Sequence, residues 1–171
     1  MNIDYQSIIP QNFSQHTRVW IYQSSRRFTS DEAVKITAHL NSFGAGWLSH
    51  GSAVKAFCTL LHDYFLVFMA DEAEMTVSGC SIDSTVRFVK SLETSFDVTF
   101  FDRTTLAFLI NGEVTLTPLN SLNSLFNSGT ITADTLFFDN TIQYLPEFRE
   151  KWLIPLASSW LGKRLNVNIQ E

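Results

Sequence analysis

Between residues 18 and 110 the spacing of the apolar residues changes repeatedly, and the order of these changes limits the folds open to the chain. Residues 18–24 alternate with the two-residue period of a strand, and a helical period follows over 29–47. Two apolar runs meet at His62 and Asp63 as an antiparallel pair, a second helical period covers 82–96, and a further strand ends at Ile110. The order strand, helix, strand, strand, helix, strand is that of the ferredoxin-like fold, in which two helices cover one face of an antiparallel sheet.

Short polar signals mark the ends of both helices in this series. Thr29 and Glu32 have the spacing of a capping box, and two glycines near residue 45 allow the first helix to end in a left-handed conformation. The second helix is predicted to begin at Ile82 with Ser81 as its N-cap.

The C-terminal part of the chain extends this arrangement. Asn111 and Gly112 form the strongest short hairpin signal, because both tolerate the positive φ of a type I′ turn between strands at 97–110 and 113–118. Pro118 and Gly129 bound a short third helix, residues 134–140 suit a further strand, and 145–165 is expected to return as helix and irregular coil. We therefore predict one α+β domain over residues 1–171, with a ferredoxin-like antiparallel sheet, helices on one face, and a C-terminal extension of a hairpin and helices.

Composition excludes several classes of protein. A formal charge of -5 argues against a protein that follows a phosphate backbone, so no nucleic-acid partner is expected. No apolar run approaches the roughly 20 residues that span a bilayer, and the first twenty residues lack the pattern of a signal peptide. We expect a soluble, cytoplasmic protein whose two cysteines, Cys58 and Cys80, remain free thiols. Fifteen Phe and four Trp predict an aromatic core.

The stretch "SGCSID" at 78–83 is the first candidate site. With a helix beginning at Ile82, Cys80 lies beside exposed amides and the positive end of the helix dipole, where the pKa of a thiol can fall. Ser78, Gly79 and Ser81 could offer amides and hydroxyls to a ligand, whereas the charge of Asp83 opposes thiolate formation. The structural alternative is that this stretch is only a turn and a helix cap.

The stretch "WLSHG" at 47–51 is the second candidate, because a loop here can present Trp47 and His50 outward. A Cys80–His50 pair would be the minimum set for nucleophilic catalysis by a thiol, while the alternative for His50 is a backbone-bonded histidine that caps a helix end. The histidines have no paired ligand spacing, and the acidic run at 71–74 fits a solvated loop, so neither a metal nor another cofactor is expected.

Four stretches, "RVWIYQSSR" (18–26), "WLSHG" (47–51), "SGCSIDSTVRFVKSLE" (78–93) and "FDR" (101–103), resemble an uncharacterised family of small bacterial proteins often labelled "ABC transporter ATPase". The resemblance covers most of the chain from Arg18 onward and implies no established activity. An ATP-binding cassette needs the run G-x-x-x-x-G-K-[ST], and these 171 residues contain none. The sequence therefore gives the ATPase label no mechanism.

These observations leave three hypotheses for the function. The first is a non-enzymatic domain that binds a partner protein or a small molecule and can form a homodimer. The second is a thiol-dependent enzyme or redox-responsive protein that uses Cys80 with His50. The third, implied by the family label, is nucleotide binding at the turn 78–83.

Overall fold

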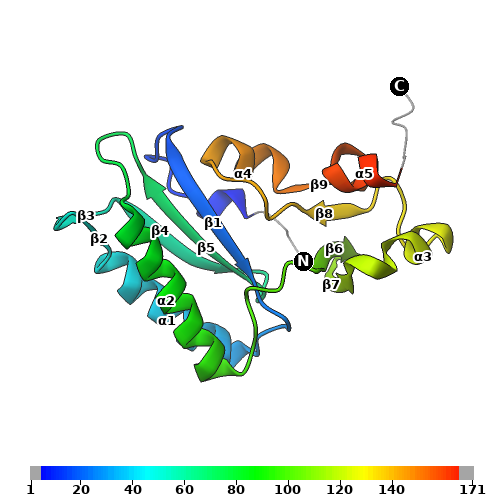
Figure 1. Ribbon diagram of the computed structural model, residues 1–171, viewed down its shortest axis with the longest axis horizontal. Helices are drawn as coiled ribbons and strands as arrows, with labels where there is room; N and C mark the ends of the chain where they lie inside the picture. Colours follow the sequence, from blue (N-terminus) through cyan, green and yellow to red (C-terminus); the bar gives the residue numbers. More distant parts are fainter. Residues whose placement is uncertain (1–4, 166–171) are drawn as a thin grey trace. The chain divides into compact units, whose positions relative to one another are not determined.

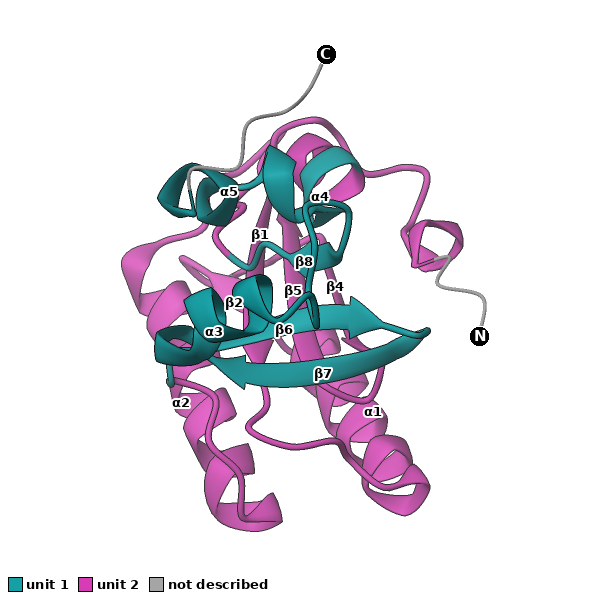
Figure 2. Cartoon of the chain, turned by 90° about the vertical axis from the view of Figure 1, so that its right-hand side faces the viewer, with its two compact units in different colours: residues 1, 102–140, 150–171 teal, residues 2–101, 141–149 magenta. Residues whose placement is uncertain are grey.

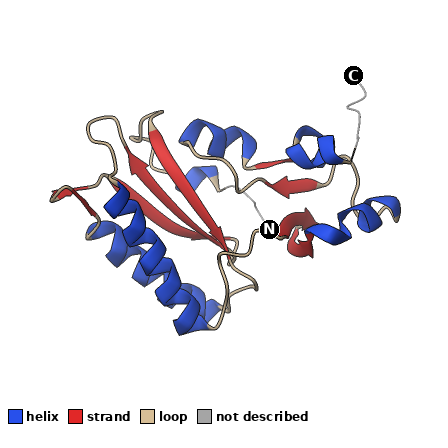
Figure 3. Cartoon of the chain, viewed as in Figure 1, coloured by secondary structure: helices blue, strands red, loops and turns tan. Residues whose placement is uncertain are grey.

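A computed structural model describes residues 5–165 of the chain; the first four and last six residues of the predicted 1–171 domain lie outside it. The chain is a mixed α+β protein with antiparallel sheets, which confirms the predicted class (Figures 1 and 3). The helices are α1 (Ser30–Ala45), α2 (Gly79–Phe96), α3 (Leu122–Asn127), α4 (Leu145–Lys151) and α5 (Trp160–Arg164), with short 3-10 helices η1 (Gln6–Ile8), η2 (Leu119–Ser121) and η3 (Leu156–Ser158). The strands are β1 (Thr17–Gln23), β2 (Leu48–Ser49), β3 (Ser52–Ala53), β4 (Ala56–Leu61), β5 (Phe65–Asp71), β6 (Thr105–Ile110), β7 (Glu113–Pro118), β8 (Leu136–Phe138) and β9 (Leu153–Pro155).

The chain divides into two compact units (Figure 2). One contains the N-terminal part of the chain through Phe101 together with residues 141–149. The other contains Asp102–Asn140 and the segment that starts at Glu150.

The N-terminal unit is built on a three-stranded antiparallel sheet in the order β1-β5-β4, and α1 and α2 lie on one face of it (Figure 1). β5 is buried along its whole length, and alternate residues Leu66, Phe68 and Ala70 point into the core shared with the two helices. Ile36 and Leu40 of α1 are fully buried in the same core. The core between this sheet and the two helices therefore contains many of the aromatic and aliphatic residues that the composition indicated.

The sequence order predicted that β6 would be a fourth strand of this sheet, and that assignment is wrong. β6 pairs with β7 and β8 in the other unit. The two-residue turn joins β6 to β7 directly, and closing so short a loop costs less entropy than pairing with a distant strand. The outer edge of β1 instead meets residues 143 and 144, with the amide of Val19 donating to the carbonyl of Gln143 at 2.8 Å.

The second unit has a four-stranded sheet in the order β7-β6-β8-β9. Asn111 and Gly112 have φ of 52° and 80°, as expected for the predicted hairpin turn. Leu106 and Phe108 of β6 pack with Leu122 of α3 and Leu161 of α5 in a separate core. The predicted third helix is shorter than expected, because Pro118 ends β7 and a 3-10 turn precedes α3.

The predicted start of α1 is confirmed, and the predicted start of α2 is wrong. Thr29 and Glu32 form the predicted capping box at the start of α1. α2, however, begins at Gly79 with Ser78 as its N-cap, three residues before the predicted start. Cys80 is therefore the second residue of the helix. The first of the two apolar runs that meet at His62 and Asp63 is not one strand: Ser52 and Ala53 form β3, which pairs with β2 in a separate short hairpin, and β4 begins at Ala56.

Candidate functional site

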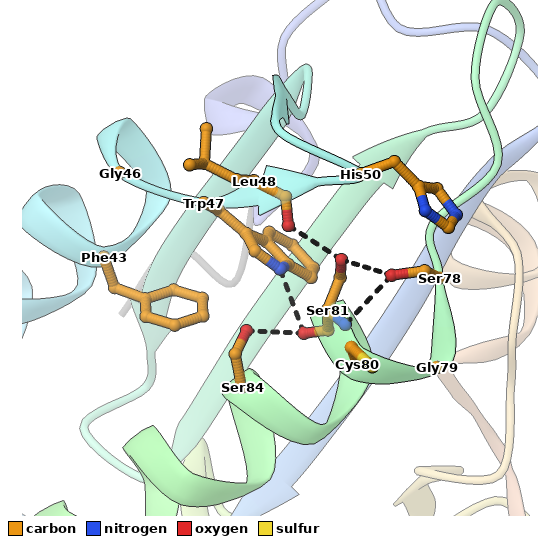
Figure 4. Close-up of a pocket in the computed structure, with 10 residues that line it drawn as sticks. All are labelled: Phe43, Gly46, Trp47, Leu48, His50, Ser78, Gly79, Cys80, Ser81 and Ser84. Atoms are coloured by element: carbon orange, nitrogen blue, oxygen red, sulfur yellow. Dashed lines mark hydrogen bonds between the residues drawn. The ribbon is translucent and has the colours of Figure 1, made fainter.

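The β2–β3 hairpin and the first turn of α2 form the two sides of an open pocket of about 650 Å³ (Figure 4). The lining residues are Phe43, Gly46, Trp47, Leu48, His50, Ser78, Gly79, Cys80, Ser81 and Ser84. Ligand pockets in proteins have volumes of roughly 300–1,000 Å³. The pocket therefore has the size of a small-molecule site, and it lies wholly within the N-terminal unit.

Hydrogen bonds tie the hairpin to the helix start. The hydroxyl of Ser81 donates to the carbonyl of Leu48 at 2.7 Å, and the indole Nε1 of Trp47 donates to the carbonyl of Ser81 at 3.1 Å (Figure 4). Ser49 joins the two elements again, because its hydroxyl accepts from the amide of Ser78 at 3.1 Å and donates to the carbonyl of Thr76 at 3.2 Å. The pocket is thus held open by a fixed frame.

The serine hydroxyls of this frame have no proton left to offer a ligand. Ser81 gives its single hydroxyl proton to Leu48, so in the 2.7 Å contact between the hydroxyls of Ser78 and Ser81 the donor is Ser78. The hydroxyl of Ser84 donates to the carbonyl of Ser81 at 2.5 Å. Within residues 5–165, the amides of Gly79 and Cys80 in the first turn of α2 have no acceptor.

Aromatic and aliphatic side chains make the remaining walls. The rings of Phe43 and Trp47 lie 5.5 Å apart, and Trp47 is 2% exposed, so only an edge of its indole borders the pocket. Leu48 stands on the rim with 53% of its surface exposed. Trp20 of β1 supports Trp47 from behind with an edge-to-face contact at 5.8 Å. Among residues 5–165, no Lys, Arg, Asp or Glu lines the pocket.

His50 lies at the tip of the β2–β3 hairpin. His50 and Gly51 have φ of 50° and 81°, which are the left-handed values of a type I′ turn. Asn or Gly would adopt this conformation at less cost than histidine. The turn fixes the backbone of His50 and presents its exposed ring on the Ser78 side of the pocket (Figure 4).

The structure brings most of the predicted site residues together. Trp47, His50, Ser78, Gly79, Cys80 and Ser81 all line this one pocket. Asp83 does not line it and is exposed in the second turn of α2. Cys80 is exposed and Cys58 is buried, and both are free thiols.

Cys80 and His50 share the pocket without a direct bond. Among the described residues, no hydrogen bond joins the Cys80 sulfur to either ring nitrogen of His50. The predicted pair is therefore brought to one site, but it is not arranged as a hydrogen-bonded nucleophile and base. The other thiol is unsuited to chemistry, because burial raises the pKa of Cys58 to about 12.

Four lining residues were not predicted from the sequence: Phe43, Gly46, Leu48 and Ser84. Phe43 and Trp47 are four residues apart, which indicated only that they share a side of the first helix. Leu48 and Ser84 carried no signal, because their place at the pocket depends on the unpredicted hairpin and on the earlier start of α2.

A polar network anchors the loop that leads into the site. The carboxylate of Asp71, at the end of β5, accepts from Lys55 Nζ at 2.7 Å, from the amide of Ala73 at 3.1 Å, and from both the amide and the hydroxyl of Ser14. Glu72 accepts from the amide of Val77 at 2.8 Å. These bonds fix residues 71–77 and hence the position of the N-cap Ser78.

The part of the chain that the structure describes has neither a metal-binding cluster nor a membrane-spanning helix. Residues 5–165 contain no group of three or more His, Cys, Asp or Glu side chains placed to hold a metal ion. In the same range, none of the helices combines the length and the apolar character needed to cross a bilayer.

No protein-family model, curated protein or solved structure matches this chain.

Proposed function

We propose that this protein is a non-enzymatic binding domain, and that the pocket between the β2–β3 hairpin and α2 is its recognition site. The observation that carries this proposal is the pocket itself: its walls are largely apolar, and internal hydrogen bonds hold it open. A frame that needs no rearrangement reduces the entropic cost of binding.

The lining favours a ligand with an apolar body and one hydrogen-bond acceptor, such as a carboxylate or a carbonyl. Phe43, Trp47 and Leu48 offer apolar contact. Within residues 5–165 the amides of Gly79 and Cys80 have no acceptor, and they lie at the positive end of the dipole of α2. The ligand can be a small molecule or the side chain of a partner protein.

The same lining weighs against the nucleotide hypothesis. A triphosphate carries several negative charges, and cationic side chains or a metal ion usually balance them. In the part of the chain that the structure describes, no Lys or Arg lines the pocket, and the hydroxyls of Ser78 and Ser81 already donate within the chain.

Nuclear magnetic resonance can test the proposal with the ¹⁵N-labelled full chain. Octanoate and octanol are the probes, because they share an apolar body and differ in the acceptor. Both should shift the indole resonance of Trp47, and octanoate should shift the amides of Gly79 and Cys80 more than octanol does. If both probes leave these three resonances unmoved at millimolar concentration, the pocket does not bind this class of ligand.

Matched variants locate the binding. Leu48→Glu places a charge on the pocket rim and should weaken octanoate binding about tenfold or more, because the charge opposes both the apolar contact and the carboxylate. Ile8→Glu makes the same change at another exposed apolar residue, which lies in η1 and outside the pocket lining, and should leave binding unchanged. Equal losses in the two variants would show that binding occurs elsewhere.

The second candidate is thiol chemistry at Cys80, favoured by the presence of this exposed thiol and the His50 ring in one pocket. Cys80→Ala separates the candidates. A binding domain should retain the octanoate shifts at Trp47 and Gly79 in this variant. A thiol enzyme would lose its turnover completely, and a histidine base would make His50→Ala show the same loss.

The order β1-β5-β4 with two helices on one face is that of a ferredoxin-like sheet without its fourth strand. We therefore propose that the N-terminal unit is a ferredoxin-like variant. We also propose that the chain is related to the small bacterial proteins it resembles. The protein then acts in the cytoplasm with both thiols reduced.

A further inference from the structure

His50 occupies a turn position that does not itself require a histidine. The turns His50-Gly51, between β2 and β3, and Asn111-Gly112, between β6 and β7, both join their strands with two residues. Their φ values are nearly the same, 50° and 81° in the first turn and 52° and 80° in the second. Asn-Gly is the pair that such a turn favours, because both residues tolerate positive φ. The backbone at position 50 therefore does not account for an imidazole ring there.

The ring of His50 is available to a ligand. It is exposed and lies on the Ser78 side of the pocket (Figure 4). Within residues 5–165 the ring makes no hydrogen bond, ion pair or ring contact. Ser78 directly precedes Gly79 and Cys80, whose amides have no acceptor in the same range, so the ring and these amides border one part of the pocket. The other described histidines do not line the pocket: His16, His39 and His62.

His50 is also the side chain through which the pocket lining can gain positive charge. Among residues 5–165, the titratable side chains of the lining are His50 and Cys80. A histidine can change its charge between about pH 5 and 8. The other walls include the apolar side chains of Phe43 and Leu48. A charge beside such walls is less screened than a charge surrounded by water, so it attracts an anion more strongly.

The charged groups on the elements packed against the hairpin do not supply this charge. They are Asp83 and Arg87 in α2, and, at the end of β5 and in the segment that follows it, Asp71, Glu72 and Glu74. Asp71 accepts from Lys55 Nζ at 2.7 Å. Glu72 accepts from the amide of Val77 at 2.8 Å and lies 4.0 Å from Arg18. The other three are exposed, so water and salt screen them, and none of the five lines the pocket.

We infer that His50 selects the head group of the ligand: its protonated ring pairs with a monoanionic acid group on an apolar body. The pocket then binds such acids more tightly as pH falls from about 8 to about 6, and it binds neutral ligands of the same body with unchanged affinity. One imidazolium ring carries one positive charge, which balances one negative charge and not a polyphosphate. This role of His50 rests on the proposed binding function of the pocket and adds the charge class of its ligand.

Titrations of the ¹⁵N-labelled full chain with octanesulfonate and with octanol, at about pH 8 and about pH 6, test this role through the indole resonance of Trp47. A sulfonate stays ionised at both values, so any pH dependence of its binding belongs to the protein. Octanesulfonate should bind about threefold or more tightly at the lower pH, which is the effect expected of one partly exposed ion pair. Octanol should bind equally at both values.

Matched variants assign the dependence to one side chain. His50→Asn removes the imidazole and keeps a residue that suits the turn, as Asn111 does, and it should bring the ratio of the two octanesulfonate affinities close to one. His16→Asn makes the same change at an exposed histidine outside the lining and should keep the wild-type ratio. Cys80→Ala should also keep the ratio, although it removes the other titratable side chain of the lining. A wild-type ratio near one, or an equal ratio in His50→Asn, would overturn this role of His50.

The ring resonances of His50 provide a second readout that does not depend on a variant folding well. Because protonation and anion binding are linked, saturating octanesulfonate should move the midpoint of the His50 ring titration to higher pH, by about 0.5 pH unit or more, and octanol should not. An unmoved midpoint, with both probes still shifting Trp47, would overturn the role of His50 and leave the proposed function standing. If neither probe shifts Trp47, both fail.

Discussion

The carboxylate of Asp71 accepts four hydrogen bonds in the N-terminal unit, and replacing it should destabilise the unit measurably. Asp71 is 7% exposed. Its Oδ2 accepts from Lys55 Nζ and the Ser14 amide, and its Oδ1 accepts from the Ser14 hydroxyl and the Ala73 amide. Asp71→Asn preserves the shape but replaces one accepting oxygen with an NH₂ group. Two of the four donors then face another donor.

The expected loss follows from these contacts. A hydrogen bond to a charged group contributes about 1.5–3 kcal/mol. The Lys55 side chain is 49% exposed, so water can solvate it after the substitution, which limits the loss. We expect Asp71→Asn to reduce the free energy of unfolding by about 2–3 kcal/mol. For a chain of this size that loss corresponds to a fall of about 4–12 °C in Tm.

Thermal melts followed by circular dichroism measure this effect. Glu74→Gln is the matched control, because it removes an exposed carboxylate from the same acidic run that accepts no hydrogen bond within residues 5–165. A Tm change in Asp71→Asn no larger than that in Glu74→Gln would refute the reasoning, since it would show that the four bonds add nothing over solvation of the carboxylate.

The same substitution should have a defined pH dependence. Desolvation raises the pKa of Asp71, but the hydrogen bonds from Lys55, Ser14 and Ala73 outweigh it and hold the pKa well below its usual range. The folded-state pKa is therefore below the unfolded value of about 3.9. The stability that ionised Asp71 contributes is fully present above that value and is lost as pH falls toward the folded-state pKa. The Tm difference between wild type and Asp71→Asn should persist from pH 7 to about pH 5 and shrink below about pH 4.

Three further experiments, a pair of glycine substitutions, a titration and a thiol labelling, test other parts of the structure. Gly162→Ala should lower Tm by several degrees, because its Cβ would lie 2.5 Å from the carbonyl oxygen of Ala157, whereas Gly79→Ala, whose Cβ meets nothing within 4 Å, should not. The bidentate hydrogen bond from Arg26 and the bond from the Thr29 amide lower the pKa of Glu32 to about 2, and a carbon-detected titration should place the midpoint of Glu32 there. The stability that ionised Glu32 contributes should disappear only as pH falls toward that value. A midpoint above about 4 would contradict the capping geometry. Iodoacetamide at about pH 8 should give a single adduct on Cys80 in the folded protein, and labelling of buried Cys58, whose pKa is raised to about 12, should require unfolding, as peptide mass mapping would show.

Local structure was readable from the sequence because its causes are local. Thr29 and Glu32 satisfy each other's backbone amides within a single turn, and Asn111 and Gly112 adopt a conformation that few other residue pairs tolerate. The partner of β6 was not readable in this way. An apolar strand fits either sheet, and the choice depends on loop closure and on the core that each sheet provides.

The start of α2 shows how two equivalent signals can mislead. Ser78 and Ser81 are both good N-cap residues, and the apolar period begins at Ile82, which favoured Ser81. In the structure Ser78 caps the helix, and the hydroxyl of Ser81 donates to the backbone carbonyl of Leu48, which lies outside the helix. A contact with a residue 33 positions away decided the cap, and no local pattern contains that information.

The place of the pocket illustrates the same limit at the level of function. His50 and Cys80 could be named separately as a loop histidine and a thiol near a helix start, but the element that brings them to one pocket, the β2–β3 hairpin, has only two residues in each strand. Such a hairpin is too short for hydrophobic periodicity to reveal it. Hydroxyl and backbone groups of Ser49, Ser78 and Ser81 hold it against α2. Because serine is common on every surface, only the three-dimensional arrangement distinguishes these three from solvated ones, and the same arrangement leaves the amides of Gly79 and Cys80, rather than the hydroxyls, to meet a ligand.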